Sequence, residues 1–178
     1  MSNITAGTWQ LDPTHTEIGF AVRHIMSKVR GKFETFEGTL VTADDITNST
    51  VSVSVDLSSI STGTADRDNH LRSSDFFSIE THPTMTFSTT GVAQNSETDF
   101  VVTGDLTIKG ISKSIDLAVE FLGEGKDPWG GTRVGVEATA QISRKDWGID
   151  FNIPLEGDKV MIGDKITITI NSEAVLQA

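Results

Sequence analysis

The chain has 178 residues, a formal net charge of −11 and no cysteine. The lack of cysteine excludes disulfides and thiolate metal sites. The acidic balance disfavours both a generic nucleic-acid binder and a protein held on anionic lipid by a basic surface. No apolar run is long enough for a transmembrane helix, so we expect no membrane insertion. The first residues lack the cationic head and apolar core of a signal peptide, and we expect a cytoplasmic protein with one domain over residues 1–178.

Apolar and polar residues alternate along most of the chain. Successive side chains of a strand point to opposite faces, so each alternating stretch predicts a strand with one buried face and one wet face. A single wet face per strand is typical of antiparallel sheets. The clearest stretches, in chain order, are 18–24, 51–57, 85–89, 100–108, 115–121, 134–144 and 166–170.

Turn-forming clusters, such as residues 43–45 and 127–131, separate these stretches. Within residues 31–41 the apolar phase changes between Phe33 and Phe36, which predicts a β-bulge. A meander of antiparallel strands gains stability by closing, because closure removes exposed edges. We therefore predict an all-β fold, a single antiparallel barrel of roughly eight strands, with room inside for side chains or one small ligand.

Residues 62–77 are too polar and irregular for a strand. Thr64 fits the N-cap of a helix, and Asp68 and Arg72 have the i, i+4 spacing of a helical ion pair. The segment ends in two adjacent phenylalanines that are unfavourable in solvent. We predict a short helix that lids one end of the barrel, with a second helical turn at residues 25–29.

Two of the predicted inward faces end in a cation, because His24 and Arg144 continue the apolar phase of the residues before them. An interior that is apolar along its length and cationic at one end indicates a container for a long apolar molecule with a polar or anionic head. Arg suits such a head because its planar fork donates paired hydrogen bonds. The alternative is an internal ion pair of Arg144 with Asp146 or with an acid of residues 66–68, since buried charges are usually paired.

Several short motifs follow one another along nearly the whole chain, at residues 9–16, 20–24, 29–33, 35–38, 58–63, 67–77, 104–110 and 143–148. In identity and order they resemble the YceI-like family of polyisoprenoid-binding proteins. The resemblance implies a lipocalin-like barrel whose cavity holds an extended isoprenoid or similar lipid chain. It also implies a homodimer. We expect a long-chain isoprenoid or quinone-like lipid as the partner, and no separate cofactor.

The function predicted from these observations is the binding of an extended apolar lipid, as carrier, storage or buffer. The alternatives are a fully packed barrel with a structural or partner-binding role, and an enzyme that acts on an isoprenoid lipid. The predicted ligand-binding residues are Ile18, Phe20, Val22, His24, Phe36, Val53, Val55, Leu71, Phe76, Phe77, Met85, Phe87, Phe121, Val136, Ile142, Arg144 and Trp147.

Asp12, His15, Asp66, His70 and His82 raise the question of a metal site, and the i, i+4 spacing of Asp66 and His70 permits ligation. No His-x-x-x-His repeat accompanies them, so we predict capping and hydrogen-bonding roles and no metal. The sequence also lacks a nucleophile elbow, a phosphate-binding loop and a dinucleotide fingerprint. We therefore predict a protein without catalytic residues, the alternative being acid–base catalysis by a histidine such as His15.

Overall fold

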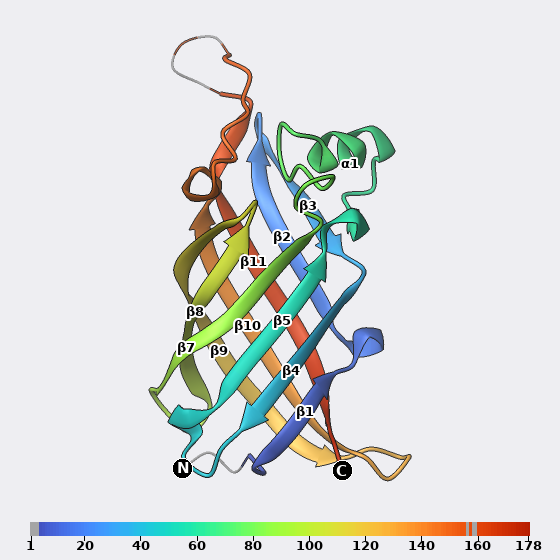
Figure 1. Cartoon of the computed structure of the whole chain (residues 1–178), viewed down its shortest axis with the longest axis vertical. Coiled ribbons are helices and arrows are strands. Elements are labelled where there is room, and N and C mark those ends of the chain that lie inside the picture. The colour runs from blue at the N-terminus through green and yellow to red at the C-terminus, as the bar shows by residue number, and fades with distance from the viewer. Residues whose placement is uncertain (1–3, 156, 158–159) are drawn as a thin grey trace.

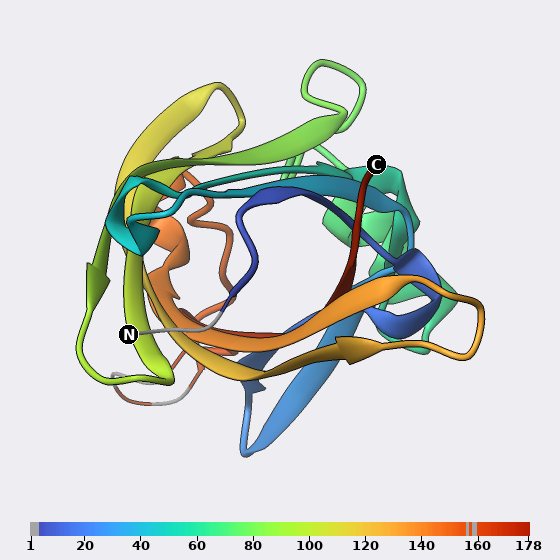
Figure 2. The ribbon, with the colours of Figure 1, turned by 90° about the horizontal axis from the view of Figure 1, so that it is seen from below.

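The computed structural model describes residues 4–155, 157 and 160–178, most of which lie in strands (Figure 1). Across this described part the strands form one antiparallel sheet that closes on itself, as the view along its axis shows (Figure 2). The predicted all-β barrel is confirmed. The strands are β1 (Gly7–Leu11), β2 (Glu17–His24), β3 (Ser27–Phe33), β4 (Phe36–Thr42), β5 (Thr50–Asp56), β6 (Ile60–Ser61), β7 (Thr84–Gln94), β8 (Asp99–Ile108), β9 (Ile111–Lys126), β10 (Thr132–Ser143) and β11 (Ile162–Leu176).

The barrel has eight strand positions around its circumference, because β1 and β2 share one position and β3 and β4 share another. Both β1 and β2 pair with β11, β1 at residues 174–176 and β2 over residues 162–171. In the same way β4 pairs with β1 while β3 pairs with β2. The contact of β1 with β11 closes the ring, which gives partners to strands that would otherwise form edges.

The helical elements lie between strands. They are the 3-10 turns η1 (Pro13–His15), η2 (Ile46–Asn48), η3 (Leu57–Ser59) and η4 (Arg144–Trp147), and the α-helix α1 (Ala65–Arg72). At the break between β1 and β2, the Asp12 carboxylate accepts a hydrogen bond from the Thr14 N–H at 3.0 Å, and Pro13 has no N–H to continue the ladder. Asp12 and Pro13 together therefore end β1 and begin η1.

The predicted bulge between Phe33 and Phe36 is a complete break between β3 and β4. The Glu34 N–H leaves the ladder and donates to the Ser59 carbonyl oxygen at 3.2 Å. Phe33 and Phe36 are both buried. The predicted bulge is therefore wrong, and the change of phase results from the two residues between the strands, Glu34 and Thr35.

Alternation within the longer strands is confirmed, most clearly in β8, where Phe100, Val102, Leu106 and Ile108 are buried and the residues between them are more exposed. Glycine shapes the inner face at one strand pair. A Cβ atom at Gly31 would lie 2.4 Å from the Phe20 ring across the strand, so only glycine lets that ring lie against the barrel wall.

The predicted helix is confirmed as α1, which lies at one end of the barrel (Figure 1). Thr64 is its N-cap residue, as predicted, although its side chain makes no cap hydrogen bond. The predicted ion pair of Asp68 with Arg72 is wrong. Asp68 accepts hydrogen bonds from the N–H and hydroxyl of Thr62 instead of pairing with Arg72, whose Nε donates to the Ser58 carbonyl oxygen. These bonds tie the helix to η3 and to the residue that follows β6.

The predicted helical turn at residues 25–29 is also wrong, because residues 25 and 26 form the tight turn of the β2–β3 hairpin and residues 27–29 begin β3. Ile25 has a positive φ of 55°, which is unusual for a β-branched residue and allows the chain to reverse between His24 and Ser27. Among the helices of the described residues, none has the length and apolar character to cross a membrane.

Candidate functional site

The barrel encloses a cavity of about 380 Å³, a size typical of small-molecule sites. Side chains from strands all round the barrel line it, and almost all of them are apolar. The predicted ligand-binding residues lie on this lining with one exception. Those that line it are Ile18, Phe20, Val22 and His24 of β2, Val53 and Val55 of β5, Leu71 of α1, Phe76 and Phe77 after it, Met85 and Phe87 of β7, Phe121 of β9, Val136 and Ile142 of β10, and Arg144 and Trp147 of η4.

Phe36 is the exception. It is buried, but it packs in a cluster with Phe33, Leu57 and Ile60 and does not reach the cavity wall. The strand break before Phe36 places its ring in this cluster. Phe33, on the other side of the break, lines the cavity in its place.

Sequence reasoning missed more than half of the lining residues, and two groups among them bear on the site. The first is the inner face of β8, with Phe100, Val102, Leu106 and Ile108, although its alternation was visible. The second is the pair Arg67 and His70 on α1. Their i, i+3 spacing places them on one side of the helix, together with Leu71, which was predicted.

The polar end of the cavity lies beside α1. We call it the α1 end and define it by the lining residues His24, Arg67, His70 and Arg144. His24 is the last residue of β2 and pairs with Ile162. The Ile162 carbonyl oxygen lies 3.4 Å from Arg144 Nη2. Bonds and strand pairing thus bring the two predicted inward cations to the same place.

Arg144 is 5% exposed and uses its guanidinium to hold the segment between η4 and β11. Nε donates to the Gly163 carbonyl oxygen at 2.9 Å, and Nη1 donates to those of Ile149 and Phe151 at 3.0 and 2.9 Å. Burial lowers the pKa of Arg144, and nearby Asp164 and Asp150 partly offset this effect. Most of its donors are therefore occupied by the protein itself.

The predicted ion-pair partners of Arg144 are wrong. Its acidic neighbour is Asp164 at the start of β11, with Oδ1 3.7 Å from Nη2. Neither Asp146 nor an acid of residues 66–68 pairs with it in the described part of the chain. The other oxygen of Asp164 lies 3.4 Å from Lys145 Nζ, so the carboxylate bridges two consecutive cations.

An aromatic cluster closes the wall between α1 and the segment after η4. The His70 ring lies edge-on to Phe76 and to Phe151, with centroids 5.0 and 4.9 Å apart, and Nε2 lies 2.9 Å from an oxygen of Asp75. Phe76 and Phe151 are 5.3 Å apart. Asp75, not Asp66, is thus the acidic partner of His70 in this structure.

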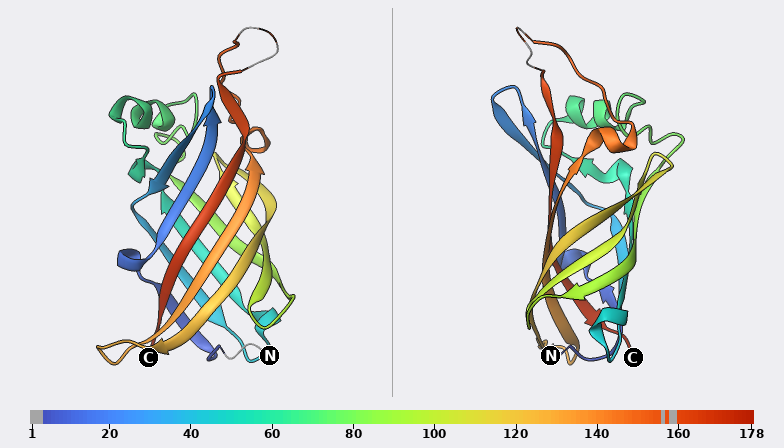
Figure 3. Two further views of the ribbon diagram at one scale, coloured as in Figure 1. Left: turned by 180° about the vertical axis from the view of Figure 1, so that it is seen from behind. Right: turned by 90° about the vertical axis from the view of Figure 1, so that its left-hand side faces the viewer.

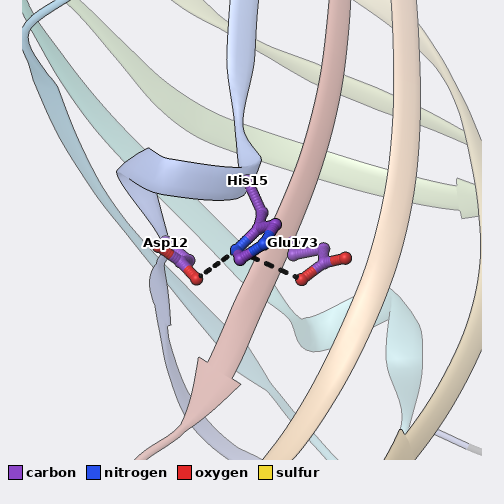
Figure 4. Close-up of side chains that lie close together, drawn as sticks. All are labelled: Asp12, His15 and Glu173. Atoms are coloured by element: carbon purple, nitrogen blue, oxygen red, sulfur yellow. Dashed lines mark hydrogen bonds and ion pairs between the residues drawn. The ribbon is translucent and has the colours of Figure 1, made fainter. Parts of the chain in front are cut away.

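A second polar cluster lies where β1 ends, away from the cavity lining (Figure 4). His15 Nδ1 is 2.8 Å from Asp12 Oδ2 and 3.9 Å from Glu173 Oε2. Arg133 Nη1 lies against the same two oxygens, at 2.7 and 3.2 Å. A guanidinium in this position competes with any metal cation, so the donor set fits an ion-pair network better than a metal site.

The network lowers the pKa of Asp12 far below its ordinary value, chiefly through the hydrogen bond with His15 and then through that with Arg133. It links the turn after β1 to β10 and β11, which are distant in sequence. Asp12 and His15 therefore have the capping and hydrogen-bonding roles predicted for them.

Comparison with known proteins agrees with this geometry. Residues 9–174 match the family model of the YceI-like domain. The chain belongs to the YceI-like family. A UPF0312 protein of Photorhabdus laumondii is 39% identical over 156 residues, which are 85% of this chain and 81% of that protein.

Solved structures of this family and fold are similar along the whole chain. The YceI protein of Campylobacter jejuni is 29% identical with a TM-score of 0.74, and the match covers 100% of both chains. A polyisoprenoid-binding domain from Saccharophagus degradans has a TM-score of 0.69 at 17% identity, covering 97% of this chain and 100% of that one. At that identity the second likeness shows the fold alone.

Proposed function

We propose that this YceI-like barrel binds one extended apolar lipid, an isoprenoid or an isoprenoid quinone, and acts as its carrier or buffer. The observation that supports the proposal most is the cavity, whose lining is almost wholly apolar, with its charged side chains gathered at the α1 end. A fully packed structural barrel would leave no such space. The polyisoprenoid-binding description of the S. degradans domain, which shares the fold, points to the same class of ligand.

Apolar contact alone supplies enough free energy for tight binding. Each buried CH₂ group contributes ~0.8 kcal/mol, so about fifteen such groups contribute ~12 kcal/mol before the cost of ordering the chain. A flexible lipid therefore needs few specific contacts. Polar groups select the head of the ligand and its direction in the barrel.

The head group is assigned to the α1 end, and Arg67 and His24 are its proposed contacts. Arg67 Nε and Nη2 donate to Thr62, at 2.8 and 2.9 Å, while its Nη1 makes no hydrogen bond with the described residues. His24 is half-buried on the lining. Arg144 is less suited to this role because backbone carbonyl oxygens already occupy most of its donors.

In this proposal the barrel binds its ligand without covalent chemistry. The proposal also includes the homodimer that the family resemblance implies. No nucleophile–base pair borders the cavity among the described residues. His70, the lining histidine with an acidic partner, is bonded to Asp75 and packed between two rings. These contacts hold the aromatic cluster together.

The test is binding of a fluorescent isoprenoid analogue to wild type, to Phe20→Asp and to Glu137→Gln. Phe20 lines the cavity, and an unpaired carboxylate there is costly. Glu137 lies on the outer phase of β10 and is the matched control. We expect Phe20→Asp to lose binding while its circular dichroism stays that of a folded protein. Equal binding by a folded Phe20→Asp variant would place the ligand outside the cavity.

A further inference from the structure

The β2–β3 hairpin projects beyond the barrel wall at the α1 end (Figures 2 and 3). Its inward residues line the cavity, whereas the alternate positions carry Arg23, Lys28, Arg30 and Lys32, all exposed. Arg23 lies directly opposite Lys28 in the strand pairing. Residues 18–33 contain no acid, so four of the 14 Lys and Arg residues of a chain with net charge −11 gather on one face of this hairpin.

These four cations have no internal function visible in the fold. The ion pairs between described residues involve Arg133, Arg144, Lys145 and histidines, and none involves the outer face of the hairpin. Like charges placed opposite one another on a strand pair destabilise it. The outer face of the hairpin carries this repulsion and has no internal anionic partner, so it suits an external binding partner of opposite charge.

The tip of the hairpin is apolar and exposed. Ile25 is 51% and Met26 is 89% exposed. The Ile25 N–H donates to the Met161 carbonyl oxygen at 2.7 Å, and the Met161 N–H donates to that of Ile153 at 3.0 Å. Ile153 and Val160 are exposed too, so four of the eight exposed large apolar side chains in the described structure lie at the hairpin tip or on the bridged segment hydrogen-bonded to it, and we call these four residues the patch. Scattered exposed apolar residues need no explanation, but a cluster does.

The patch adjoins the cavity. Val22 and His24, directly before the tip, line it, and so do Met161 and Ile162 on the segment hydrogen-bonded to the tip. A surface that the patch contacts would therefore lie beside the α1 end, where the head group of the ligand is proposed to lie.

We propose that the β2–β3 hairpin docks on the surface of an anionic phospholipid bilayer. Ile25 and Met26 enter the headgroup layer, and the four cations face lipid phosphates. Transfer of a lipid between bilayer and cavity rests on the proposed function, whereas docking itself does not. The net charge of −11 opposes approach at long range, but charges are screened beyond roughly 8 Å at physiological salt, so the cationic hairpin decides the contact.

A second copy of the chain fits this surface less well. A symmetric dimer through the hairpin would place the same cationic face against itself, and like charges across an interface are repulsive. An acidic bilayer removes this repulsion and accepts the apolar tip at the same time.

The experiment is co-sedimentation of delipidated protein with vesicles, either of phosphatidylcholine or of equal parts phosphatidylcholine and phosphatidylglycerol. Lys28→Gln is compared with Lys126→Gln, which removes one cation near the opposite end of the barrel. Met26→Gln is compared with Leu122→Gln, since Leu122 is also exposed. Lipid retention by each variant is measured separately by solvent extraction, and oligomeric state by light scattering.

We expect binding to the anionic vesicles only, weakened by added salt. Lys28→Gln should weaken it about fivefold, the usual contribution of one basic residue near such a surface. Met26→Gln should weaken it about tenfold, and the two controls should bind as wild type does. Equal effects of Lys28→Gln and Lys126→Gln, or no vesicle binding while lipid is still recovered from the cavity, would overturn docking and leave the proposed function intact. A dimer that Met26→Gln dissociates, without vesicle binding, would assign the tip to a second copy.

Discussion

His70 lies edge-on against Phe151, with ring centroids 4.9 Å apart, and this contact joins α1 to the segment that follows η4. Phe76 packs against both rings. Because His70 and Phe76 also line the cavity, the contact is part of the cavity wall at the α1 end. The two segments on either side of it are the ones that must separate if a lipid passes there.

Replacement of Phe151 by alanine is therefore expected to speed the release of a bound lipid. An edge-on aromatic pair contributes about 0.5–1.5 kcal/mol, so loss of the His70–Phe151 contact should raise the release rate about two- to tenfold. The rate is measured by transfer of a fluorescent isoprenoid analogue from loaded protein to excess acceptor vesicles. Leu122→Ala, on the outer face of β9, is the control, and an unchanged rate in Phe151→Ala would show that the lipid leaves by another route.

Arg144→Lys is expected to destabilise the fold although it keeps the charge. The ammonium group cannot reach the carbonyl oxygens of Ile149, Phe151 and Gly163 together, so buried acceptors lose their donors. We expect a loss of about 2–4 kcal/mol in the free energy of unfolding, measured by urea denaturation. Lys145→Gln removes an exposed neighbouring cation and should change stability by less than about 0.5 kcal/mol. Wild-type stability in Arg144→Lys would mean that these bonds are dispensable.

Trp147 should report directly on ligand position. It is fully buried, donates its indole N–H to the Leu106 carbonyl oxygen at 2.9 Å and lines the cavity, whereas Trp129 is 77% exposed and Trp9 packs in a different cluster. In a variant that keeps Trp147 alone, with Trp9→Phe and Trp129→Phe, a brominated apolar ligand should quench most of the fluorescence. The matching variant that keeps Trp129 alone should show little quenching, and the reverse order would place the ligand outside the barrel.

Acid should weaken the ion-pair network around Asp12. Its pKa is held below its unfolded value of about 3.9 by His15 and Arg133. A depressed folded-state pKa stabilises the protein above the unfolded pKa, and this stability is lost as the pH falls through about 4 and below. Asp12→Asn should lower Tm by roughly 2–4 °C at pH 7.

The difference in Tm between wild type and Asp12→Asn should shrink toward pH 3, as calorimetry across that range would show. Asp44→Asn, an exposed carboxylate in a loop, is the control at both pH values. A Tm difference that grows in acid would contradict the assigned direction of the Asp12 pKa.

Strand alternation predicted the barrel because one face of each strand is buried, and it placed His24 and Arg144 on the inner face. Strand alternation could not predict the side-chain partners that depend on tertiary contacts. The partner of Arg144 is Asp164, twenty residues further along the chain, and the pairing of β10 with β11, with Ser143 opposite Lys165, brings the two together. Phe36 was assigned to the cavity because a change of phase does not show whether a strand bulges or breaks. The cationic face of the hairpin was not predicted, because the net charge is a sum over the whole surface and does not show how cations are distributed on it.

The central claim is that the cavity holds an isoprenoid-class lipid. Protein purified without detergent is extracted with organic solvent, and the extract is analysed by mass spectrometry beside that of Phe20→Asp. We predict an isoprenoid or isoprenoid quinone in near-equal molar amount with wild type and its loss from the folded variant. An extract of wild type without such a lipid, from protein that also fails to take up an added isoprenoid, would contradict the claim.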